Sequence, residues 1–335
     1  MEDATNSNEL NASIITAGNL ALDSFNTKVI QIKTEIGKVI VGQEDTVDLL
    51  LAGLFAGGHM LLEGVPGIAK TLTAKLLAKT LSVDFSRVQF TPDLMPSDVV
   101  GTQVFNLKTS EFYFKKGPVF SNIVLIDEIN RAPAKTQSAL FEVMEEQQIT
   151  NDGTTYSLSF PFVIMATQNP VEQEGTYKLP EAQLDRFLFR IKLGYPTLEQ
   201  EINIVRKFSN DFEGTIKESV KSIMSATDLR TFRDLVQKVY IKDELADYIA
   251  KITVETRSHA DLYLGASPRA SLAIMRSAKA IAAMNGRDFV TPDDIQFVCF
   301  PVLNHRLILM PEREIEGITT DDVIREIIQK IEVPR

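Results

Sequence analysis

Short apolar runs recur along the first part of the chain, and each is bounded by polar or turn-forming residues. Runs of this length and composition are typical of strands that are buried on both faces of a parallel sheet. Between the runs, apolar residues recur at the spacing of an α-helix. The pattern predicts strands at 59–63, 86–90, 123–126, 162–165 and 187–193, and helices at 25–40, 45–56, 72–81 and 134–147.

Strands that alternate with helices favour an α/β fold, in which a parallel sheet carries helices on both faces. Two segments break this alternation and predict β-hairpins, near 103–114 and 149–160, and a loop is expected at 92–101. After Pro196 the strand pattern fades, and a smaller all-α domain is expected. Its predicted helices lie at 197–207, 227–239, 242–258, 268–285 and 291–299. We therefore expect a flexible N-terminal segment at 1–24, an α/β domain at 25–195 and an α-helical domain at 196–335.

The loop after the first strand has the composition of a phosphate-binding loop. A strand, a glycine-containing loop and a helix follow one another here, which is the context that a P-loop requires. Backbone N–H groups and the helix N-terminus would hold phosphate, Lys70 would reach the terminal phosphates, and the Thr71 hydroxyl would bind Mg2+. The alternative is a glycine turn beside an exposed lysine, which the flanking strand and helix disfavour. The loop residues are Gly64, Val65, Pro66, Gly67, Ile68, Ala69, Lys70 and Thr71.

Ala69 departs from the usual P-loop pattern, which has glycine immediately before the lysine. Alanine carries a Cβ atom, so Ala69 must adopt a backbone conformation that an alanine is allowed. Gly67, two residues earlier, is the candidate for the tightest turn.

Two strand ends carry polar residues suited to phosphate chemistry. Asp127 and Glu128 follow the run 123–126, and Asn169 follows the run 162–165. Asp127 would bind Mg2+, Glu128 would polarise the attacking water, and Asn169 would orient that water. The alternatives are a solvated acidic turn for the two carboxylates and a turn-forming asparagine before Pro170. Because the carboxyl ends of parallel strands meet at one edge of a sheet, we expect these side chains to lie together.

The composition narrows the class of protein. The chain has 335 residues and a formal net charge of -10, which disfavours general affinity for nucleic acid or anionic membranes. Cys299 is its one cysteine, so an internal disulfide is excluded, and His59, His259 and His305 are too scattered to suggest a metal site. No apolar run is long enough for a membrane span, and the polar N-terminus does not resemble a signal peptide. The expected location is the cytoplasm.

Taken together and in this order, these motifs resemble the AAA+ ATPases over about residues 25 to 310. Several segments resemble the MoxR family in particular, in which alanine before the P-loop lysine is normal. The hairpins would then be its helix-2 insert and pre-sensor hairpin, with the α/β part as the nucleotide-binding domain and the α-helical part as a lid. The segments are 64–71, 125–133, 166–170, 179–187 and Gly-Ala-Ser-Pro-Arg at 265–269.

The resemblance also implies roles for residues that composition alone leaves open. Val41 and Gly42 would contact adenine, Asn169 would be sensor 1, Arg186 the arginine finger and Arg269 sensor 2. Arg190 is a weaker rival for the finger, and whether Arg269 acts within its own subunit or on the next is open. Arg131 would face a subunit boundary. The alternative is an ordinary surface cation for Arg186 and Arg269 and a surface salt bridge for Arg131, although Arg suits charge on a transferring phosphoryl group.

A finger donated to a neighbour implies a homo-oligomeric ring, a hexamer by resemblance. MoxR-type ATPases are thought to use ATP and Mg2+ to remodel or mature protein complexes, with a von Willebrand factor A domain protein as a partner. The alternatives are a nucleotide-gated binding module that hardly hydrolyses ATP, a nucleic-acid motor, and a chelatase-type motor subunit. Glu128 and Asn169 disfavour the first, and the acidic charge balance disfavours the second.

Overall fold

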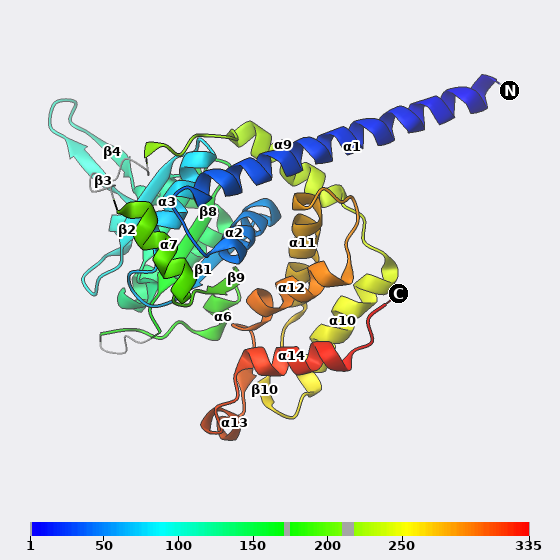
Figure 1. The fold of residues 1–335 in the computed structure, drawn as a ribbon. Coiled ribbons are helices and arrows are strands. Elements are labelled where there is room, and N and C mark those ends of the chain that lie inside the picture. The colour runs from blue at the N-terminus through cyan, green and yellow to red at the C-terminus, as the bar shows by residue number, and fades with distance from the viewer. Residues whose placement is uncertain (1, 171–174, 210–217, 335) are drawn as a thin grey trace.

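The computed structural model describes residues 2–170, 175–209 and 218–334, with side chains from residue 20 onward. Its centre is a five-stranded sheet in the order β2-β5-β8-β1-β9, and all of its strand pairs are parallel. The predicted parallel sheet is therefore confirmed (Figure 1). Its strands are β1 (His59–Glu63), β2 (Phe85–Gln89), β5 (Ile123–Asp127), β8 (Val163–Gln168) and β9 (Phe187–Lys192).

Helices cover both faces of this sheet because successive strand residues point to opposite sides. On β1, Met60 and Leu62 belong to the core that contains α2 (Glu44–Ala56) and α3 (Lys70–Thr80). Leu61, between them, belongs to a second core with α5 (Ala134–Glu146). All three leucine and methionine side chains are fully buried, which explains why this strand is a continuous apolar run.

The first helix begins earlier than expected. We predicted a start at Phe25, whereas α1 runs from Glu2 to Gly37 and projects from the body of the molecule in Figure 1. Phe25 itself is fully buried and packs against Phe55 of α2, at 4.6 Å between ring centroids. The part of α1 from Phe25 onward is thus the part that the apolar pattern detected. The flexible segment at 1–24 stays a prediction.

Both predicted hairpins are present as separate two-stranded sheets. One consists of β3 (Gly101–Asn106) and β4 (Glu111–Lys116) and projects from the core in Figure 1. The other consists of β6 (Gln148–Asn151) and β7 (Thr154–Ser157). The expected loop at 92–101 instead contains a short helix, α4 (Pro96–Val100), because proline starts the helix and the Asp98 carboxylate accepts the Met95 N–H at 2.8 Å. Three further short turns of helix are η1 (Pro118–Phe120), η2 (Ile129–Arg131) and α6 (Glu181–Leu184).

The C-terminal part is the expected helical lid, and it adds elements that the periodicity did not predict. The strands β10 (Leu262–Leu264) and β11 (Ile308–Leu309) form a short antiparallel pair, followed by α13 (Pro311–Ile315) and α14 (Thr320–Lys330). The predicted helices correspond to α7 (Leu198–Phe208), α9 (Ala226–Lys238), α10 (Asp243–Ser258), α11 (Pro268–Met284) and α12 (Pro292–Leu303).

Two details of the lid bear on later arguments. Helix α12 continues through Pro301 to Leu303, beyond the predicted end at 299, because Val302 and Leu303 are fully buried and packing outweighs the lost hydrogen bond. Cys299 is fully buried in the same helix, and burial raises the pKa of its thiol to about 12. Among the described residues, no helix combines the length and apolar composition that crossing a membrane would need.

Candidate functional site

The loop after β1 wraps back over its own lysine. The Lys70 ammonium group donates hydrogen bonds to the carbonyls of Gly64 and Val65, the second at 3.1 Å. Ala69, at the N-terminus of α3, adopts the left-handed conformation with φ 62°. This conformation normally favours glycine and costs an alanine on the order of 1 kcal/mol. Ala69, which replaces the glycine of the usual P-loop pattern, therefore adopts the left-handed backbone conformation that glycine would adopt.

The predicted polar residues converge on one cavity of about 350 Å3 at the carboxyl edge of the sheet. The loop follows β1, Asp127 ends β5 with Glu128 directly after it, and Asn169 follows β8. These three strands are neighbours in the sheet, which brings side chains together that lie a hundred residues apart in the chain. Lys70 and Thr71 line the same cavity.

Asp127 is the most buried carboxylate of this cavity, with 5% of its surface exposed. The Thr71 hydroxyl lies 3.3 Å from both of its oxygens, and the Thr167 hydroxyl donates at 3.2 Å. The Arg87 guanidinium forms an ion pair with it at 2.6 Å. A carboxylate beside a threonine hydroxyl is an all-oxygen donor set, which is the chemistry that Mg2+ prefers. The residues present therefore fit a magnesium ion held by Thr71 and Asp127.

Glu128 points away from Asp127 because its backbone is left-handed, with φ 57° and ψ 53°. Its N–H donates to the Thr167 hydroxyl at 3.0 Å, which anchors the turn. Its carboxylate accepts a hydrogen bond from Gln89 at 2.8 Å and pairs with Arg131 at 2.9 Å. The two adjacent carboxylates are thus held in different directions, one toward Thr71 and the other toward Gln89. Arg131 is engaged in the ion pair that was the alternative to a boundary role.

An adjoining cavity of about 380 Å3 is more apolar and is lined in part by residues of the P-loop. Val41 and Gly42 line it, together with Ile68 and Leu72 from the P-loop region and Ile204 and Phe208 from α7. Gly42 has φ 73°, and a Cβ atom there would lie 2.3 Å from the Gln200 side chain. The positive φ angle therefore favours glycine at this position. A flat heterocycle fits an apolar cleft of this kind beside a phosphate-binding loop.

The two predicted arginines lie together in a separate cavity of about 440 Å3. Arg186 donates to the Phe141 carbonyl and lies 3.4 Å from Glu145, whereas Arg269 is 61% exposed and lies 3.9 Å from Asp185. Among the described residues that line this cavity, none belongs to the P-loop. Arg190 points elsewhere and forms an ion pair with Glu63 of β1.

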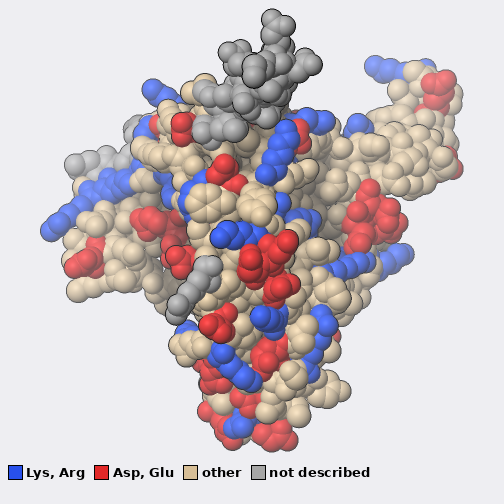
Figure 2. Space-filling view, turned by 90° about the vertical axis from the view of Figure 1, so that its right-hand side faces the viewer, with Lys and Arg blue, Asp and Glu red and all other residues tan. Residues whose placement is uncertain are grey.

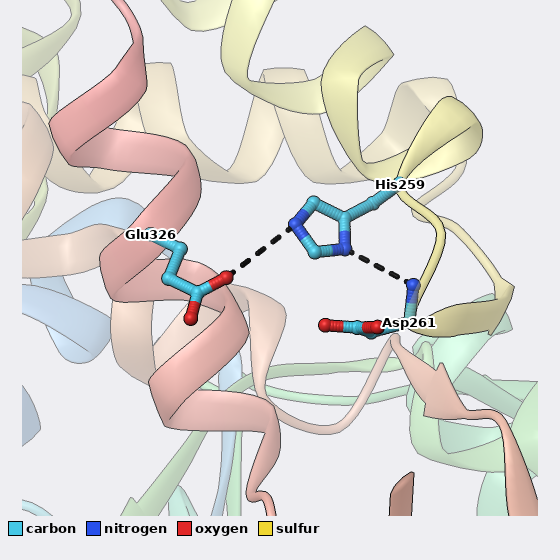
Figure 3. A group of neighbouring side chains, drawn as sticks. All are labelled: His259, Asp261 and Glu326. Atoms are coloured by element: carbon cyan, nitrogen blue, oxygen red, sulfur yellow. Dashed lines mark hydrogen bonds and ion pairs between the residues drawn. The ribbon is translucent and has the colours of Figure 1, made fainter. Parts of the chain in front are cut away.

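The histidines occupy three different environments. Buried His59 accepts the Ile164 N–H at 2.9 Å, and burial lowers its pKa to about 4. Burial also lowers the pKa of His305 well below its usual value. His259 lies beside Asp261 and Glu326, at 3.8 Å from the Glu326 carboxylate (Figure 3). The spacing of the histidines along the sequence does not indicate this group, because it contains only one histidine. Arg313 pairs with Asp261 at 2.7 Å, so this carboxylate already has a cationic partner.

Sequence reasoning missed Arg87, Gln89 and Thr167, which line the cavity of about 350 Å3, called the phosphate-side cavity below. Arg87 and Gln89 are two residues apart on β2, so both side chains point to the same face of the sheet, beside Asp127 and Glu128. The presence of polar residues two apart in a strand next to the acidic strand was the available clue.

On the face drawn in Figure 2, acidic and basic side chains are intermixed.

Comparisons with known proteins agree with this arrangement. Residues 59–189 match the family model described as the ATPase family associated with various cellular activities (AAA), and residues 254–327 match the AAA lid domain. A crystal structure of an inferred ATPase from Cytophaga hutchinsonii is similar, with a TM-score of 0.88 and 45% identity. The similarity covers 96% of this chain and 99% of that one.

Two curated relatives are similar over most of the chain. The uncharacterized protein YeaC of Bacillus subtilis is 48% identical over 89% of this chain and 92% of its own length. Chaperone MoxR1 of Mycobacterium tuberculosis is 43% identical over 90% of this chain and 81% of its own length. With its core and lid matched and a named MoxR protein aligned along most of its length, the chain belongs to the MoxR family of AAA+ ATPases.

Proposed function

We propose that the protein hydrolyses ATP with Mg2+ and uses the energy to remodel or mature protein complexes. The observation that carries the hydrolysis is the convergence of Lys70, Thr71, Asp127, Glu128 and Asn169 on one cavity. Lys70 supplies a cation for the terminal phosphates, and Thr71 and Asp127 supply oxygen ligands for a metal. Glu128 supplies a base, and Asn169 supplies an amide. A binding module without turnover would not need the last two.

Each group in the cavity has a role that its position supports. Bound Mg2+ would neutralise charge on the phosphates and would be held by Thr71 and Asp127. Glu128 accepts a proton from the attacking water, and Asn169 orients that water. Residues 64–69 hold the phosphates through their backbone, and Val41 with Gly42 contacts the adenine in the adjoining cleft.

We further propose that Arg186 and Arg269 act on the nucleotide of a neighbouring copy in a hexameric ring. Their common cavity is formed without the P-loop residues, so they are poor candidates for the nucleotide of their own chain. An arginine that reaches transferring phosphate stabilises charge that develops in the transition state. Arg190 is disfavoured as the finger because its ion pair with Glu63 holds it inside the sheet.

The remodelling role rests on two supporting observations. One relative carries the name of a chaperone, and the hairpin β3–β4 exposes apolar side chains at its tip, including Leu107 at 86% and Phe112 at 70%. Protein clients, a von Willebrand factor A domain partner and a cytoplasmic location complete the proposal. It also includes the division into a segment at 1–24, a nucleotide-binding domain at 25–195 and a lid at 196–335.

Phosphate release from ATP by the purified full-length chain tests the hydrolysis. Release that depends on both ATP and Mg2+, and stops when the metal is chelated, is the expected result. If the chain binds ATP with Mg2+ but releases no phosphate at any protein concentration that supports assembly, the protein is a nucleotide-gated binding module. A strong acceleration by DNA would instead favour a nucleic-acid motor.

A further inference from the structure

Three consecutive lid residues contact the backbone of the segment that carries Arg186. They are Asn304, His305 and Arg306, which follow α12 directly. Asn304 donates to the Arg190 carbonyl at 3.2 Å, and the His305 Nε2 atom lies 3.0 Å from the Phe187 carbonyl. The lid is therefore attached to β9 and to the residues just before it, although more than a hundred residues separate the two in the chain.

Arg306 makes most of these contacts. Its Nε donates to the Asp185 carboxylate at 2.7 Å, and one terminal nitrogen donates to the carbonyls of Asp185 and Phe187 at 3.1 and 2.7 Å. The other terminal nitrogen donates to the Leu188 carbonyl at 3.2 Å and to the Val302 carbonyl. The guanidinium thus binds the main chain on both sides of Arg186.

A substitution of Arg306 should disrupt these contacts, because the side chain is buried, with only 9% of its surface exposed. A guanidinium presents several N–H groups in a fixed plane, and a lysine in the same place could satisfy only part of the acceptor set. Asp185, one of the acceptors, also lies 3.9 Å from Arg269. One buried arginine consequently supports both Arg186 and Arg269, which line the cavity of about 440 Å3.

We propose that Arg306 is a positioning residue, which sets the location of Arg186 and Arg269 relative to the neighbouring copy. The inference rests on the proposed function, in which these two arginines act on the neighbour's nucleotide. Arg306 also lines the cavity of Arg186 and Arg269, but its donors are all directed at main-chain carbonyls and the Asp185 carboxylate of its own subunit, so it is not assigned a contact with that nucleotide. A misplacement of about 1 Å in such a group lowers turnover by on the order of 100-fold.

The proposal predicts which nucleotide site suffers when Arg306 changes. Among the described residues, Arg306 lies outside the lining of both the phosphate-side and the apolar cavities. ATP binding by the variant subunit should therefore persist, while hydrolysis by the next subunit falls. A purely structural role would instead weaken the variant subunit's own fold and its own ATP binding.

The test compares full-length Arg306→Lys with Arg287→Lys, a matched lid control. Arg287 forms a bidentate ion pair with Asp294 at 2.6 and 2.7 Å within the lid. We expect Arg306→Lys to lower kcat by about 10- to 100-fold with KM for ATP within about twofold of the parent. The control variant should keep the parent values. Mixing Arg306→Lys with Glu128→Gln subunits should restore part of the turnover, because some interfaces combine an intact Glu128 with a well-placed Arg186.

The mixing experiment separates the inference from the function on which it rests. Arg186→Ala mixed with Glu128→Gln serves as the reference pair. If the reference pair recovers and the Arg306→Lys pair does not, or if Arg306→Lys alone keeps full kcat, the positioning role is overturned. If the reference pair itself stays inactive in rings that exchange subunits, the action across subunits fails, and this inference fails with it. If Arg306→Lys does not fold, Asp185→Asn is judged by the same criteria.

Discussion

Arg186 and Arg269 share the carboxylate of Glu145, which lies 3.4 Å from the first and 3.5 Å from the second. Glu145 belongs to α5, Arg186 precedes β9 and Arg269 lies in the first turn of α11, so core and lid meet at this point. Under the proposed action across subunits, a phosphate group of the neighbouring copy would have to replace this single anion between the two cations. The relationship motivates testing the two arginines as a pair.

Arg186→Ala and Arg269→Ala should each bind ATP normally and hydrolyse it poorly. A charge contact made mainly in the transition state lowers kcat more than it weakens binding. Steady-state kinetics and a nucleotide-binding titration measure the two quantities separately. Arg325→Ala, an exposed lid arginine paired with Asp322, is the control and should leave both unchanged. Equal losses in binding and turnover would place these arginines at the nucleotide of their own subunit.

Lys70→Ala should remove most of the ATP affinity while the fold survives. Lys70 donates to the carbonyls of Gly64 and Val65, whereas with ATP it would donate to charged phosphate oxygens. Such charge-assisted bonds contribute about 1.5–3 kcal/mol, so affinity should fall by about 10- to 100-fold. Calorimetric titration with ATP measures the change, and Lys75→Ala, on the exposed face of the same helix, is the control. Unchanged affinity in Lys70→Ala would remove the P-loop assignment.

Glu128→Gln should keep ATP bound and nearly stop hydrolysis. The amide preserves the size of the side chain but cannot accept a proton as the carboxylate does. Turnover assays with a Glu146→Gln control on α5 test this expectation. Turnover within about threefold of the parent would exclude Glu128 as the base. If the expectation holds, the same variant retains clients in the ATP-bound state, and their recovery by affinity purification identifies them.

The fold and the site were predictable from sequence to different extents. The strands β1, β5, β8 and β9 were found because they are buried along most of their length, which leaves an apolar run, and the P-loop lies directly between a strand and a helix. The edge strand β2 has only one buried residue, Val88, so its apolar signal is weaker. β10 and β11 were missed because strands of two or three residues show no periodicity. The joint cavity of Arg186 and Arg269 could not be predicted, because it depends on how the lid packs against α5 and β9. Arg87 was missed because its partner Asp127 lies on the neighbouring strand, forty residues later.

Stability should fall as the pH drops from about 6.5 to about 4, and His59 should contribute to the fall. Burial lowers the folded-state pKa of His59 to about 4, with the nearby charge of Arg233 acting in the same direction. In this window the unfolded chain binds the proton and the folded chain does not, so acidification favours unfolding. The full contribution of this histidine is on the order of 3 kcal/mol. Unfolding by denaturant at several pH values, with His59→Gln as the comparison, should show a shallower pH dependence in the variant. An identical slope in both proteins would contradict the prediction.

The burial of Cys299 has a practical consequence for tracing subunit contacts. The chain contains no other cysteine, and a buried thiol whose pKa is raised to about 12 forms almost no thiolate at neutral pH. Cysteines introduced on the surface are therefore the reactive thiols of their subunit, and no existing residue has to be removed first. With one such residue beside the P-loop and a second beside Arg186 in every subunit, the proposed ring predicts a bond between neighbouring copies. The ladder of cross-linked species on a gel would then count the copies in the assembly and identify the faces that touch.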